Sequence, residues 1–335
     1  MPLYAQASKI AQTDYLFLTS LLRAREAWML TREKLEQMLE SRSFDDACRI
    51  AADCGYPDMS GMHLREVEDT LSAHRHEQMQ DIENMIPDVE LLDLFRLKFD
   101  YHSAKALVKS EGQAKHLITY DGRGSAESLL KYFMQKDLNM LPVPLAESIR
   151  DATSMLARTG NPCLADLILD RAYFGEMRAL AEQTALPFAI GYVEKLIDVT
   201  NLKTLIRSRA AGKRPEIARE LLFEGGAIDC AQIAAVMDAD EDIIALFAAS
   251  GLTDAARKGI EFLSGGSMTE FECACDNAVI EYLSDDTRIG FGPEVVIEYM
   301  AALENEIVSL RIILTGKLMG IDAETLRERL RECYV

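Results

Sequence analysis

The residues of this chain that could do chemistry are mainly charged pairs, and one spacing between acid and base occurs three times. The pairs are Asp100 with Lys105, Asp198 with Lys203, and Glu306 with Arg311. Five residues turn a helix by about 500°, so the base lies about 140° around the helix from the acid. The two side chains therefore cannot form the usual i,i+4 ion pair, and each should face a different neighbour. Two interpretations stay open: the acid of one repeat meets the base of the next, or all six are solvated surface charges.

A phosphate-binding loop is not predicted. Gly316-Lys317 lacks both the earlier glycine and the following Ser or Thr that such a loop requires. The short segment Gly122-Arg123-Gly124 precedes an expected helix. It is either a plain turn or a turn whose backbone N–H groups bind an anion.

Metal and nucleophile motifs are also missing from the sequence. His74 and His76 lie two residues apart in an expected helix, so their rings point to different faces and cannot share a metal. Cys273 and Cys275 lack partners for a tetrahedral site. Neither a G-x-S-x-G nor an H-E-x-x-H motif occurs. We therefore predict no catalytic residue, no cofactor and no metal site, and hence no enzyme activity of the chain itself.

Bulk composition limits the classes of partner. A formal net charge of −19 argues against nucleic-acid binding and favours basic partners. The scattered cysteines indicate reduced thiols rather than a disulfide array. The first 15 residues lack the pattern of a secretion signal, and the most apolar internal stretch, Ile243–Ala249, is too short to cross a bilayer. We expect a cytoplasmic protein without direct bilayer insertion, which reaches a membrane only through other proteins.

Nearly every long segment has the pattern of a helix, so the predicted fold class is all-α. Four residues are expected N-caps: Thr31, Ser43, Ser125 and Asp322. Three prolines are expected at or near helix starts: Pro162, Pro215 and Pro293. A short extended piece is allowed at Leu117–Tyr120. In the last long helix, Leu303, Ile307, Leu310 and Leu314 predict a narrow apolar seam.

The charged repeat lies on three long helices that divide the chain into comparable parts. We predict helical repeat units at residues 1–115, 116–213 and 214–335. Each repeat helix is also basic toward its end, at Lys105, Lys109 and Lys115, at Lys203, Arg207, Arg209, Lys213 and Arg214, and at Arg311 and Lys317. These charges either complement the helix dipole or form a positive zone for an acidic partner.

The same helices resemble a known family. The C-terminal segment FGPEVVIEYMAALENEIVSLRIILTGKLMGIDAETLRERLRECYV is similar to the end of the C subunit of V/A-type ATPases, the counterpart of the d subunit of eukaryotic V-ATPases. DVELLDLFRLKFDYHSAKALVKSE and YVEKLIDVTNLKTLIRSRAAGK resemble its first two repeat helices, and MLTREKLEQMLESRSFDDACRIAADCGY its opening helices. The resemblance runs from about Tyr4 to Val335. The third repeat departs only in using Glu and Arg in place of Asp and Lys.

This resemblance implies three similar helical units arranged as a pseudo-threefold funnel. It implies a non-catalytic socket in the central stalk of a rotary ATPase or ATP synthase. Its partners would be the rotor ring subunits of the membrane sector and the central shaft subunits, and it would transmit torque between ATP chemistry and proton or sodium transport. We expect the polar zone around the repeat helices, at Lys105, Lys203 and Arg311, to lie near the funnel wall. The alternative is a free-standing helical repeat scaffold that binds soluble protein partners.

Overall fold

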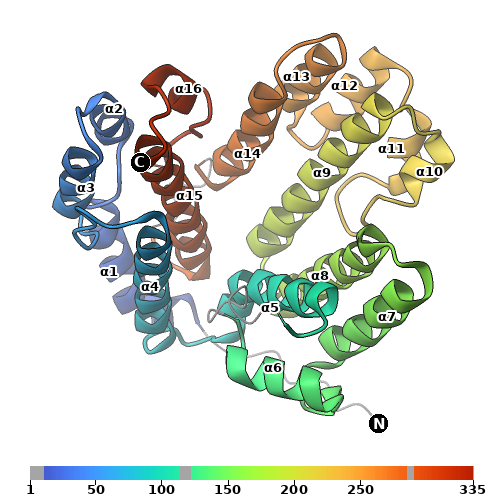
Figure 1. The fold of residues 1–335 in the computed structure, drawn as a ribbon, viewed down its shortest axis with the longest axis horizontal. Coiled ribbons are helices and arrows are strands. Elements are labelled where there is room, and N and C mark those ends of the chain that lie inside the picture. The colour runs from blue at the N-terminus through green and yellow to red at the C-terminus, as the bar shows by residue number, and fades with distance from the viewer. Residues whose placement is uncertain (1–10, 114–121, 285–289, 335) are drawn as a thin grey trace. The chain divides into compact units, whose positions relative to one another are not determined.

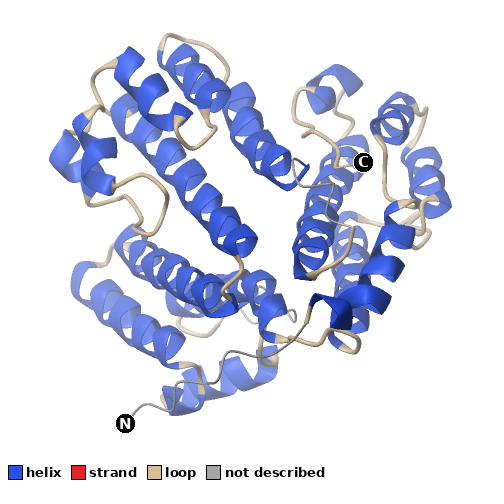
Figure 2. Ribbon diagram, turned by 180° about the vertical axis from the view of Figure 1, so that it is seen from behind, coloured by secondary structure: helices blue, strands red, loops and turns tan. Residues whose placement is uncertain are grey.

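The structure is a computed structural model, and it describes residues 11–113, 122–284 and 290–334. Every regular element in these ranges is a helix, which confirms the all-α prediction (Figure 2). The extended piece expected at Leu117–Tyr120 lies outside the described residues. Within the described ranges, no helix is both long and apolar enough to span a membrane.

Local signals in the sequence set several helix starts. The side chains of the four expected N-caps each accept a backbone N–H three residues further on, and they begin α2 (Arg32–Glu40), α3 (Phe44–Asp53), α6 (Ala126–Gln135) and α16 (Ala323–Arg327). Proline is the first residue of α8 (Pro162–Thr184), α9 (Pro187–Ala210), α10 (Pro215–Arg219) and α15 (Pro293–Leu318). Proline suits this position because its missing N–H would have no partner within the helix.

One compact unit combines residues 1–89 with residues 280–335. Its further elements are η1 (Gln12–Tyr15), α1 (Leu16–Glu26) and α4 (Leu64–Glu83). The C-terminal α15 packs against α1, α2, α3, α4 and α16 (Figure 1). All four residues of the expected apolar seam are buried, but the buried surface of α15 is wider than this seam, because residues on every side of the helix are buried from Val295 to Leu303.

The other compact unit comprises residues 90–279. It contains α5 (Glu90–Ser110), α6, η3 (Leu138–Met140), α7 (Val143–Thr159), α8, α9 and α10. It continues with α11 (Cys230–Ala235), α12 (Asp240–Ala248), α13 (Thr253–Leu263) and most of α14 (Met268–Ser284). Helix α8 packs against α5, α7 and α9, and α9 packs in turn against α10, α11 and α13. Phe247 and Phe271 are fully buried in a core with Ile206 of α9.

Candidate functional site: three repeated carboxyls and a pocket at Glu306

Asp100, the first repeated acid, is buried on α5 and faces the turn before α6. Its Oδ1 accepts the backbone N–H of Arg123 at 3.1 Å, and its Oδ2 accepts from Nε of the same arginine at 2.7 Å. Arg123 also donates to Glu176 of α8 at 2.6 Å. Burial raises the pKa of Asp100, and the arginine opposes that rise. The turn at 122–124 therefore does bind an anion through its backbone, and that anion is a carboxylate of the chain itself.

Asp198, the second repeated acid, has no exposed surface on α9. Its Oδ1 accepts the backbone N–H of Ile228 at 3.3 Å, while its Oδ2 is buried without a hydrogen bond among the described residues. Burial raises the pKa of Asp198 to about 6, and the N–H groups of Ala227 and Ile228 act in the opposite direction. In the part of the chain that the structure describes, no arginine binds this carboxyl as Arg123 binds the first, so it is the less compensated of the two.

Glu306, the third repeated acid, is buried on α15. Its Oε1 accepts the backbone N–H of Leu30, in the connection between α1 and α2, at 3.0 Å. Burial raises the pKa of Glu306 to about 7. All three repeats therefore use a buried carboxyl to hold the backbone of a loop outside its own helix.

Glycine lets two of these loops approach their carboxyls. A Cβ on Gly122 would lie 2.0 Å from Oδ1 of Asp100, and a Cβ on Gly226 would lie 2.2 Å from Oδ1 of Asp198. Both distances are well below any van der Waals contact, so a side chain at either glycine would displace the carboxyl.

The three repeated bases form ion pairs with acids on other helices. Lys105 pairs with Asp170 of α8 at 2.5 Å, Lys203 with Asp276 of α14 at 2.6 Å, and Arg311 with Glu68 of α4 at 2.7 Å. The idea that the repeated acids and bases pair with one another is therefore wrong, and so is the alternative of six solvated charges. The spacing of five residues could not identify the partners, because it fixes only the angle between the two side chains.

The other basic residues near the helix ends are largely occupied within the chain. Lys109 pairs with Asp166, Arg207 with Glu272, and Arg209 with Asp240. Lys317 donates to two backbone carbonyls. Internal acids therefore reduce the positive zone for an acidic partner, which was one of the two interpretations. Lys213 and Arg214 are exposed, and Lys115 lies outside the described residues.

A third position of the repeat was missed in the sequence. Three residues after each acid stands a small polar residue, namely Ser103, Asn201 and Ser309, and all three are buried. Asn201 bonds both the N–H and the C=O of Phe223, at 2.8 Å each. The full pattern is acid-x-x-polar-x-base, and comparing the three helices directly would have found it.

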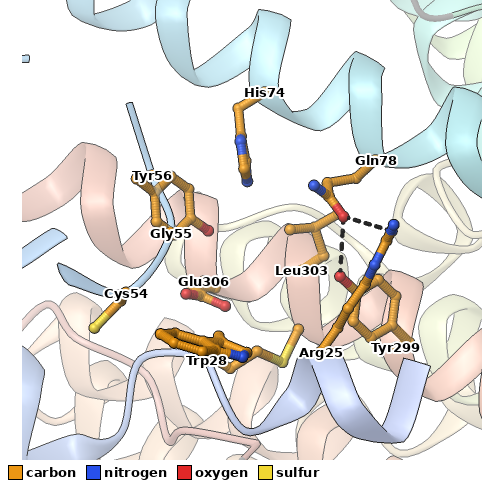
Figure 3. Close-up of a pocket in the computed structure, with 11 residues that line it drawn as sticks. Arg25, Trp28, Cys54, Gly55, Tyr56, His74, Gln78, Tyr299, Leu303 and Glu306 are labelled. Atoms are coloured by element: carbon orange, nitrogen blue, oxygen red, sulfur yellow. Dashed lines mark hydrogen bonds between the residues drawn. The ribbon is translucent and has the colours of Figure 1, made fainter. Parts of the chain in front are cut away.

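A pocket of about 170 Å³ lies against Glu306 within the unit of residues 1–89 and 280–335 (Figure 3). Trp28, Tyr56, His74 and Tyr299 line it together with the carboxyl. The Tyr56 and His74 rings are 4.5 Å apart, centroid to centroid. Burial lowers the pKa of His74, so the imidazole is neutral near pH 7.

Other candidates from the sequence do not assemble into a site. His76 contacts Gln80 rather than His74, and Cys273 and Cys275 are buried free thiols. Within the described ranges, no three His, Cys, Asp or Glu side chains are grouped as a metal site would need.

Comparison with known proteins identifies the family of this chain. Residues 18–329 match the model of a family described as ATP synthase (C/AC39) subunit. The C subunit of the V-type sodium ATPase from Enterococcus hirae is 24% identical, over 96% of this chain and 99% of that protein. The C subunit of the A-type ATP synthase from Methanocaldococcus jannaschii is 22% identical over 94% and 86%. The corresponding C subunit of the V-type ATP synthase from Thermus thermophilus is 20% identical over 94% and 98%. The resemblance seen in the sequence is thereby confirmed: the chain belongs to the ATP synthase (C/AC39) subunit family and is a non-catalytic subunit of a rotary ATPase.

Proposed function

We propose that this chain is the central-stalk socket of its rotary ATPase, joining the membrane rotor ring to the central shaft. In this role it passes torque between ATP chemistry and the transport of protons or sodium ions. Its partners are the ring subunits and the shaft subunits, and it is a cytoplasmic protein held at the membrane through them. Family membership supports the assignment to the complex, and the way the three long helices are held supports the mechanical role.

The observation that carries the proposal is the order of the contacts. We propose three units at residues 1–115, 116–213 and 214–335. In this division, the repeat acid and base of the first unit bind Arg123 and Asp170 of the second. Those of the second unit bind Ile228 and Asp276 of the third. Those of the third return to Leu30 and Glu68 of the first.

Each long helix is thus fixed at two points to the following unit, and the last unit is fixed to the first. A cyclic order of this kind is what a closed, pseudo-threefold funnel would need. One fixed point is a buried carboxyl that holds backbone, and the other is a partly exposed ion pair. Two attachments on different faces of a helix resist both rotation and sliding, which suits a part that must carry torque without yielding.

The proposal is tested by adding the purified chain to detergent-solubilised rotor ring, with and without shaft subunits, and measuring co-sedimentation at low and moderate salt. We expect saturation at a single chain per ring, and retention of the shaft on the ring only when the chain is present. Binding to neither ring nor shaft would refute the socket role and favour the helical scaffold for soluble partners.

A functional test uses the reconstituted complex. Without the chain, the catalytic head should still hydrolyse ATP while ATP-driven ion transport is lost. Ion transport that persists at full rate without the chain would show that torque does not pass through it.

A further inference from the structure

We propose that the pocket at Glu306 receives one arginine side chain of a partner protein. This inference does not rest on the socket role, because it follows from the chemistry of the pocket alone. The guest is a single planar cation enclosed by aromatic rings and bound to a buried carboxylate.

The carboxyl is the polar centre of the pocket. Glu306 is 8% exposed, and one of its oxygens is occupied by the N–H of Leu30. The buried hydroxyl of Tyr56 faces the same space and is near enough to favour the ionised form of Glu306, yet no hydrogen bond of good geometry holds it among the described residues (Figure 3). A buried polar group without a partner is destabilising, so a guest that supplies hydrogen-bonding groups here would be stabilised.

The charges around the pocket favour a cation. Arg25 enters the pocket from α1, but its guanidinium is bound by Gln78 and Asp81 at 2.8 Å each. His74 from α4 is neutral near pH 7, since burial lowers its pKa. Cys54, Tyr56 and Tyr299, the other titratable groups that line it, all have raised pKa values and are uncharged at neutral pH. In its ionised form, Glu306 is therefore the uncompensated charge that a guest would meet.

The walls favour a guanidinium over other cations. Trp28 forms one side, and the Tyr56–His74 ring pair lies across the cavity (Figure 3). A guanidinium is planar, stacks on aromatic faces and binds a carboxylate through two N–H groups. A cavity of about 170 Å³ is large enough for it, since a cavity of about 150 Å³ can hold benzene.

The rim of the pocket indicates that the cation is a side chain of a partner protein. Trp28 is the only tryptophan of the chain and is 65% exposed. Exposed tryptophan beside a pocket is typical of residues that dominate protein–protein binding. The net charge of −19 attracts basic partners as well.

Binding should depend on pH in a defined way. A guanidinium binds the ionised carboxylate, and burial raises the pKa of Glu306 to about 7. Affinity should therefore increase roughly tenfold between about pH 6 and pH 8, with release of a proton on binding at the lower pH.

In the experiment, the full chain is titrated with the peptide acetyl-Gly-Gly-Arg-Gly-Gly-amide. Binding is measured by calorimetry and by the fluorescence of Trp28. The same peptide with citrulline is the neutral control, and putrescine tests a free amine. The variant Glu306→Gln keeps the size and the acceptor for Leu30 but removes the charge. Its matched control is Asp198→Asn, the same change at a buried repeat acid that lies outside the pocket.

We expect the arginine peptide to bind at least tenfold more tightly than the citrulline peptide. Glu306→Gln should lose at least tenfold in affinity together with the pH dependence, and Asp198→Asn should retain both. Trp28→Ala, a change at a mostly exposed position, should weaken binding several-fold by calorimetry. Equal binding of the citrulline peptide, or unchanged binding by a folded Glu306→Gln variant, would overturn the proposal. Tighter binding of putrescine than of the peptide would overturn the assignment to a protein side chain.

Discussion

Replacing Gly226 by alanine tests whether a carboxyl-held loop stabilises the long helices. The new Cβ would lie 2.2 Å from Oδ1 of Asp198 and 3.1 Å from its Cγ. Either the loop at residue 226 or the Asp198 carboxyl must move by about an ångström. The hydrogen bond from the N–H of Ile228 to Oδ1 would then be lost. The carboxyl would stay buried without the hydrogen bond from Ile228, at a cost of about 2 kcal/mol.

Thermal unfolding measures this cost. For a unit of this size, each kcal/mol lowers Tm by about 2–4 °C, so Gly226→Ala should lower it by about 4–8 °C. Gly124→Ala is the matched control, because its Cβ would have no neighbour within 4 Å. That control should change the free energy of unfolding by less than about 0.5 kcal/mol.

A double-mutant cycle separates the contact from other effects of the added methyl group. Asp198→Ala removes the oxygen that the Cβ would strike, so Gly226→Ala should cost much less in that background. We expect a coupling free energy of about 1–2 kcal/mol. The reasoning is refuted if Gly226→Ala is as harmless as Gly124→Ala, or if its cost is unchanged when Asp198 is alanine.

Three further predictions concern charge and thiol chemistry. The pKa of Asp198 is raised to about 6 in the fold, above its unfolded value, so its stabilising contribution is complete below about pH 4 and is lost as pH rises through about 6. Urea unfolding of the Asp198→Asn variant and of the unchanged protein measures this effect. Relative to the unchanged protein, the variant should gain about 2 kcal/mol of unfolding free energy between about pH 4 and pH 7.5. An equal difference at both pH values would contradict the prediction. Replacing Lys105, Lys203 or Arg311 by methionine should lower the free energy of unfolding by no more than about 1 kcal/mol each, because these ion pairs are partly exposed. The loss should be smaller in about 1 M salt. A larger loss that salt does not change would show that they act as buried pairs. With a thiol reagent at about pH 8, the exposed Cys163 should react first. The other thiols named here should react slowly, because burial raises the pKa of Cys48, Cys230 and Cys275 to about 12. A fast phase that remains in the Cys163→Ser variant would contradict this order of reaction.

The features that the sequence predicted correctly depend on local chemistry. Ser43 and Asp322 cap helices because their oxygens can accept N–H groups three residues further on, whatever the rest of the chain does. Proline at a helix start is equally local. The class of the fold followed from such signals repeated along the chain, and the family followed from segments distributed over nearly its whole length.

The contacts of the repeated charges could not be predicted in this way. Leu30 and Glu306 are 276 residues apart, and no local pattern links them. The burial of the first half of α15 on every side, from Val295 to Leu303, was missed for a similar reason. The spacing of its apolar residues predicts one seam. The number of helices around α15 depends instead on how α1, α2, α3 and α4 pack against it, and no local pattern gives that.

Part of the missed information was nevertheless present in the repeats. Aligning them on the acid reveals Ser103, Asn201 and Ser309, polar residues at the same position of each repeat. Local sequence predicts Gly122 and Gly226 only as turn residues. Their proximity to a carboxyl becomes visible only when the turn is folded against the helix.

The use of Glu in place of Asp in the third repeat has a geometric explanation. In the first two repeats, glycine brings the loop backbone so close that the short aspartate side chain reaches it. The loop that meets α15 has Met29 before the donor Leu30, and no glycine allows the same approach. Glutamate is longer than aspartate by one methylene, so its carboxyl can reach the N–H of Leu30 without a glycine in the loop. It also places the carboxyl in the wall of an aromatic pocket, so one difference in the repeat both fixes the helix and provides the charge for the proposed arginine site.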